Sequence, residues 1–193
     1  MRIALSATFI VIFAIFATAQ APQGMDLSND GVRIEPDKRL MVVLAALEMA
    51  SARSDTGVET KLIDTPLSAA GTAFRQRLRT DLADIPPDLR QKISTFVGLY
   101  KKRHPKGTDA EVIAPFVSMA YALTPVPELQ DPLVTTDLPG DLLDVLDFAP
   151  LVREFYRRSS IAGRLNDYVK LYTQESETVL RPTAKDMVSD LLD

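Results

Sequence analysis

His104 is the only histidine in the 193-residue chain, and this limits the chemistry that the sequence can support. A zinc site needs three or four His, Cys or carboxylate ligands, often two histidines on one helix turn in the pattern H-E-x-x-H. A Ser-His-Asp triad would have to use His104, which stands in the run KKRHP at 101–105, a pattern typical of a solvated helix end. The motif G-x-S-x-G is missing, and the eight glycines form no phosphate-binding loop. No catalytic residue, cofactor-binding residue or metal ligand is therefore predicted in this chain.

Paired carboxylates are the remaining candidates, because glycosidases work with carboxylates alone. Asp141, Asp144 and Asp147 recur at every third residue, and Glu175 and Glu177 follow later. The spacing does not match the calcium-binding loop, and about a quarter of the residues of an ordinary domain are charged, so a solvated acidic face is the simpler interpretation. Four aromatic residues could line a sugar-binding groove, but at helical spacing such residues more often belong to a core. These four are Phe155, Tyr156, Tyr168 and Tyr172.

The N-terminus has the pattern of a secretory signal peptide over residues 1–19. Arg2 precedes an apolar run, which ends in Ala17-Thr18-Ala19. A transmembrane anchor would need about 20 apolar residues, and this run stops short. The expected protein is thus exported to the periplasm or beyond, meets the membrane only through the signal peptide before cleavage, and begins with a flexible lead-in over 20–31.

The charge balance bears on partners. Without Arg2 the chain has 21 basic and 26 acidic residues, a net charge of −5. Phosphate binding needs a concentrated basic surface, so nucleic acid is not an expected partner. The chain has no cysteine, so packing alone must hold the fold.

The apolar pattern predicts a mainly α multi-helix domain over 32–193, with at most one or two short strands. The stretch 148–181 has apolar residues at helical spacing on both sides of Ser159-Ser160, which predicts two amphipathic helices. The run 40–50 is apolar on nearly every face, which predicts a buried N-terminal helix that the others surround. Further helices are expected from Pro66, Asp88, Thr108 and Pro182.

Three stretches carry a family resemblance: VRIEPDKRL at 32–40 with the apolar helix after it, YKKRHP at 100–105, and FYRRS at 155–159 leading to Tyr172. Together they resemble an exported bacterial family of unknown function whose members look like zinc metallopeptidases of the thermolysin-like superfamily. The resemblance covers about residues 32–181. It implies a helical region that precedes a helix with an H-E-x-x-H-type motif. No metal ligand carries over to this chain, and zinc would belong only to a C-terminal part that this sequence does not contain.

Two hypotheses about function follow. In the first, the chain is the non-catalytic N-terminal region of a longer metallopeptidase-like protein. In the second, it is a complete, non-catalytic helical interaction module of the bacterial envelope that binds a protein or peptidoglycan.

Overall fold

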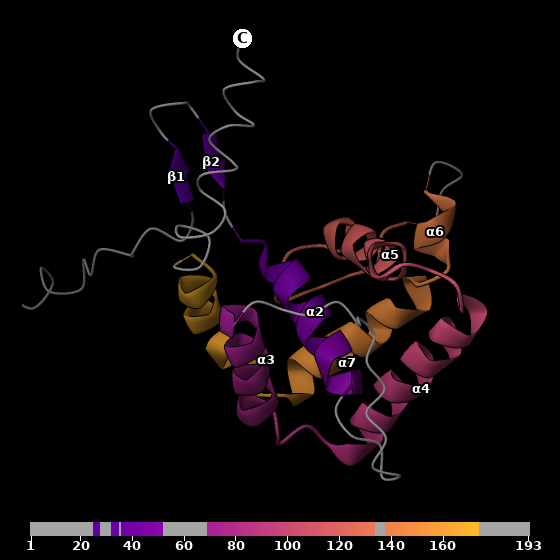
Figure 1. The fold of residues 1–193 in the computed structure, drawn as a ribbon, viewed down its shortest axis with the longest axis horizontal. Coiled ribbons are helices and arrows are strands. Elements are labelled where there is room, and N and C mark those ends of the chain that lie inside the picture. The colour runs from indigo at the N-terminus through magenta and orange to yellow at the C-terminus, as the bar shows by residue number, and fades with distance from the viewer. Residues whose placement is uncertain (1–24, 28–31, 35, 52–68, 134–137, 174–193) are drawn as a thin grey trace, which may run out of the picture.

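A computed structural model describes residues 25–27, 32–34, 36–51, 69–133 and 138–173. Several predictions lie outside these ranges: the signal peptide, the carboxylates Glu175 and Glu177, and the last helix from Pro182. Within them the protein is mainly α-helical, as predicted, and the helices surround one central helix (Figure 1).

The central helix is α2, Lys38–Ser51, which corresponds to the predicted buried helix. It contacts α3, α4, α5 and α7. Val42, Val43 and Ala46 are fully buried, while Leu44 is 38% exposed, so one side of α2 remains open. An apolar helix of this kind lowers its free energy by burying most of its faces, which requires several neighbours rather than one or two.

Helix α3, Ala69–Asp81, buries Leu78, and Leu82 in the turn after it is also buried. Helical spacing from Pro66 predicts Ala70 on the buried stripe, but it is exposed, because α3 meets the core mainly with its second half. The same spacing predicts Arg75 and Arg79 on the outer face, but both pair with Glu48 of α2. This ion-pair cluster attaches α3 to the central helix.

Helix α4, Pro87–Arg103, and helix α5, Asp109–Ala122, begin at the predicted signals. Pro87 occupies the first position of α4, where its missing N–H costs no hydrogen bond. The Thr108 hydroxyl accepts from the Glu111 backbone N–H and the Glu111 carboxylate accepts from the Thr108 backbone N–H, which is a capping box. A proline inside a helix is expected to kink or restart it. Pro115 lies inside α5, which continues through it as one helix.

The loop after α5 is held in place by packing, as its prolines suggest. Leu129 is buried with φ 48°, in the left-handed region, and its carbonyl accepts a hydrogen bond from Arg153 Nη1 at 3.1 Å. Arg153 also makes a two-pronged ion pair with Asp131. Helical spacing places Arg153 on the polar face of its helix, which predicts a solvated side chain, but Arg153 instead ties the loop to α7.

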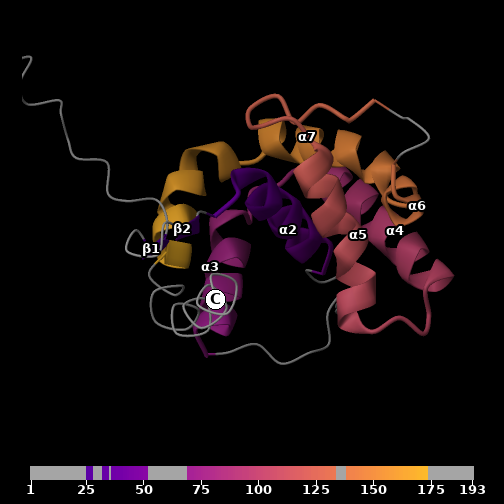
Figure 2. The same cartoon turned by 90° about the horizontal axis from the view of Figure 1, so that it is seen from above.

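The second half of the chain contains α6, Gly140–Leu143, a 3₁₀ turn at Leu146–Phe148, and α7, Ala149–Arg158. The helix breaks at Ser159 and Ser160, as predicted, and resumes over 161–173. Two helices in succession over 148–181 would be expected to pair as a hairpin, but Figure 2 shows the chain turning at the break so that 161–173 lies beside α3. The Tyr168 ring meets Phe74 of α3 edge-on at 5.5 Å.

Two short strands precede α2. β1, Met25–Leu27, pairs antiparallel with β2, Val32–Ile34, with Asp26 opposite Arg33. The alternating residues at 32–34 predict a strand there, which is β2. The stretch 20–31 is predicted as a flexible lead-in, and this is wrong for 25–27, which form β1.

Aromatic rings fill the core between α4, α5 and the 3₁₀ turn. Phe116 meets Tyr100 at 5.0 Å and Phe148 at 5.3 Å, both edge-on, and Phe96 lies 5.0 Å from Phe148. These contacts hold the second half of α4, which ends just before His104, against α5 and the 3₁₀ turn.

Candidate functional site

His104 lies just after the last residue of α4. Its backbone N–H bonds the carbonyls of Tyr100 and Lys101 at 3.1 and 3.2 Å, which ends the helix. The imidazole stacks against the Tyr100 ring with centroids 4.5 Å apart. Its side chain is 37% exposed, so His104 is a partly buried residue and not the fully solvated helix end that the sequence suggests.

The structure brings His104 close to Asp144, which the sequence treats as part of a separate acidic face. Imidazole Nε2 lies 3.9 Å from Asp144 Oδ2, within ion-pair range but too far for a hydrogen bond. Asp144 follows the last residue of α6, and its backbone carbonyl accepts from Arg103 Nη2 at 3.4 Å. Arg103 and His104, adjacent residues at the end of α4, thus both lie close to Asp144 at the end of α6.

Tyr100 forms the buried floor of this site. Burial raises the pKa of its phenol, and the negative charges of Asp144 and Asp141 raise it further, while the Arg103 guanidinium opposes the shift. That guanidinium lies 5.9 Å from the centre of the Tyr100 ring. The phenol therefore stays protonated over the physiological range and serves as a packing surface for the imidazole.

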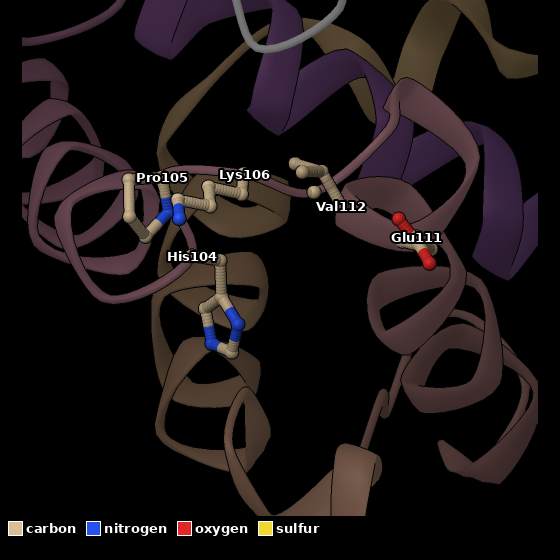
Figure 3. Close-up of a pocket in the computed structure, with 6 residues that line it drawn as sticks. His104, Pro105, Lys106, Glu111 and Val112 are labelled. Atoms are coloured by element: carbon tan, nitrogen blue, oxygen red, sulfur yellow. The ribbon is translucent and has the colours of Figure 1, made fainter.

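A pocket of about 380 Å³ opens next to His104, between the turn that ends α4 and the start of α5 (Figure 3). Its lining includes Lys106 from the turn and Val112 from α5. The Glu111 carboxylate also lines the pocket. This carboxylate is held by the hydrogen bonds of the capping box, which lower its pKa. The pocket thus combines one imidazole, one ammonium and one carboxylate already bound to Thr108.

The other candidates from the sequence are not brought together. Asp141 and Asp147 are exposed, which agrees with a solvated acidic face. Of the aromatic residues proposed for a sugar groove, Phe155 and Tyr168 are buried and Tyr156 is partly buried, so they belong to the core. Tyr172 is 40% exposed.

Two further clusters were missed at the sequence level. The Glu48 carboxylate forms ion pairs with Arg79 Nε at 2.8 Å and with Arg75 Nε at 2.9 Å. Asp81 accepts a hydrogen bond from the Tyr168 hydroxyl at 3.2 Å. Burial raises the pKa of the Tyr168 phenol, and the charge of Asp81 and this hydrogen bond raise it further. A lone carboxylate in an otherwise apolar run, as at Glu48, is a usable signal of such a pairing, because a partly buried charge needs a partner.

The described part of the chain brings together no three His, Cys, Asp or Glu side chains in the way a metal site would require. None of the helices in these same ranges is long and apolar enough to cross a membrane. Comparison with family models, curated proteins and solved structures finds no match to the chain.

Proposed function

We propose that this chain is an exported, non-catalytic helical domain that binds a partner through exposed leucines of α4 and α6. In one form, which follows the resemblance, it is the helical front part of a longer metallopeptidase-like protein. In that form the partner is a zinc-binding catalytic region of the same product. In the alternative form the domain is an independent envelope module, and its partner is a separate protein or peptidoglycan.

The observation that carries this proposal is the exposure of two leucines on a firmly packed body. Leu99 of α4 is 55% exposed and Leu143 of α6 is 47% exposed. Leu99 stands one turn from Phe96, which contacts Phe148, and one turn from Arg103, which bonds the Asp144 carbonyl. Leu143 directly precedes Asp144, so each leucine is close in sequence to one end of the hydrogen bond between Arg103 and Asp144. Exposed large apolar side chains that gather on one face are typical of protein-binding surfaces.

Binding is tested by placing a photoreactive phenylalanine analogue at position 99 or 143 of the full chain in cells. We expect covalent adducts at both positions, well above those at Gln91, an exposed polar position of α4. Adducts released by muramidase identify peptidoglycan, and adducts of fixed protein mass identify a protein partner. Equal labelling at position 91, or no labelling at 99 and 143, contradicts the proposal.

Two simple measurements separate the forms and test export. Intact mass of the protein recovered outside the cytoplasm should correspond to a chain beginning at Gln20, and a retained Met1 contradicts cleavage. Zinc bound one per chain in the purified adduct favours the metallopeptidase-linked form, and zinc-free adducts favour the independent module.

A further inference from the structure

We propose that His104 and Asp144 form a proton-operated latch, which fastens α6 to the end of α4 when the imidazole takes up a proton. This inference concerns the mobility of the α4–α6 junction and stands independently of the partner. It begins from Nε2 of His104, which is buried and has no hydrogen-bond partner in the described structure. Buried polar atoms in folded proteins are almost always paired, so an exception requires a physical reason.

The geometry supplies that reason. Neutral imidazole gains little from a carboxylate oxygen 3.9 Å away, because the distance exceeds that of a hydrogen bond. Imidazolium carries an N–H and a positive charge toward the same oxygen, and a charge-assisted hydrogen bond is both shorter and stronger. The Asp144 side chain is 51% exposed, so it has room to move toward the ring. Protonation therefore converts a loose contact into a bond between the two helices.

Charged groups of both signs surround the ring. Asp144 and Asp141 bring negative charge from the α6 side, and the backbone of Asp144 is already held by Arg103. The cations nearby are Arg103 and Lys106. The stacked Tyr100 ring stays neutral and keeps the imidazole facing α6. The charged and titratable groups that face the ring are Tyr100 and Arg103 of α4, Lys106 of the turn, Glu111 of α5, and Asp141 and Asp144 of α6 and its end.

Helix α6 is suited to respond because it is short and lightly anchored. It has four residues, of which Leu142 is buried, and it contacts α5 and the following 3₁₀ turn. Its backbone offers two probes, the Leu142 amide bonded to the Pro139 carbonyl at 3.1 Å and the Val145 amide bonded to the Leu142 carbonyl at 3.2 Å. Local opening of α6 exposes both amides to exchange with solvent.

The experiment compares hydrogen exchange of these amides at about pH 5.5 and about pH 7.5 in the full chain, each rate divided by the intrinsic rate at that pH. Histidine is the only side-chain type that ordinarily changes charge in this window, and the chain has one. We expect protection of the Val145 amide to be about fivefold higher at the lower pH, the upper range for a partly exposed ion pair. The chemical shift of the single imidazole reports its protonation in the same samples. Protection of the Val145 amide should change over the same pH range as this chemical shift.

Two substitutions decide whether the latch causes the effect. Asp144→Asn should reduce the ratio of the two protection factors to about one, and His104→Gln should do the same by removing the titrating group. Asp147→Asn, which removes an exposed carboxylate of the same acidic face, should leave the ratio unchanged. The proposal is overturned if the wild-type ratio is one, or if Asp144→Asn retains the wild-type ratio.

Discussion

Replacing Glu48 with glutamine should weaken the attachment of α3 to the central helix. The Glu48 side chain is 11% exposed and accepts from Arg75 and Arg79, whose side chains are 25% and 27% exposed. Glutamine keeps the size and removes the charge, which leaves two partly buried guanidinium groups without their carboxylate. The loss should therefore exceed what a surface pair contributes.

The magnitude lies between two limits. Removing one partner of a fully buried ion pair costs about 3–5 kcal/mol, and an exposed pair contributes about 0–1 kcal/mol. With both guanidiniums about a quarter exposed, we expect Glu48→Gln to lower the free energy of unfolding by about 2 kcal/mol. For a chain of this length that corresponds to a fall in Tm of about 4–8 °C.

Urea unfolding followed by far-ultraviolet circular dichroism measures this change, and the denaturant dependence should stay the same if only the native state is affected. The matched control is Arg77→Met on α3. Arg77 is 45% exposed and pairs with Asp81 one turn away at 3.3 Å, so its loss should cost less than about 0.5 kcal/mol. A Glu48→Gln effect no larger than that of Arg77→Met would refute the reasoning.

Three other changes test separate parts of the fold. Phe116→Ala should destabilise by about 3–5 kcal/mol in urea unfolding, because the ring is fully buried among other aromatic rings. Thr108→Ala should cost about 1 kcal/mol through loss of the α5 cap, while Thr108→Ser should retain most of it. The Arg158 guanidinium lowers the pKa of Asp88 below its ordinary 3.8 and that of Glu154 below 4.5. Carboxyl groups with lowered pKa values stabilise the fold at pH values above their ordinary pKa. The difference in unfolding free energy between wild type and Arg158→Met should therefore be present at neutral pH and should disappear as the pH falls through the lowered pKa values.

Local signals in the sequence predicted much of the helix framework. The predicted start Asp88 lies in the first turn of α4, Thr108 is the N-cap of α5, and Ser159 and Ser160 mark the break before 161–173. These signals work because caps and prolines act within one helix turn. They do not tell a kink from a restart at an internal proline: the sequence allows either at Pro115, and α5 continues through it as one helix, so no restart occurs there.

The contacts that individual side chains make in the folded protein cannot be predicted from helical periodicity. Arg153 has the sequence pattern of a solvated face, yet it holds the loop at Leu129 and Asp131. The aromatic face suggested either a groove or a core, and burial of Phe155 and Tyr168 decided for the core. The family resemblance and the signal peptide stay predictions.

The sequence by itself determined that the chain forms helices and that the apolar run at 40–50 lies inside them, because hydrophobic burial and helix capping act on neighbouring residues. Only the tertiary structure decided which charges meet. Glu48 finds Arg75 and Arg79, and His104 finds Asp144, across separations that depend on how whole helices cross. A crossing angle is set by the combined packing of many side chains, and no single stretch of sequence contains it.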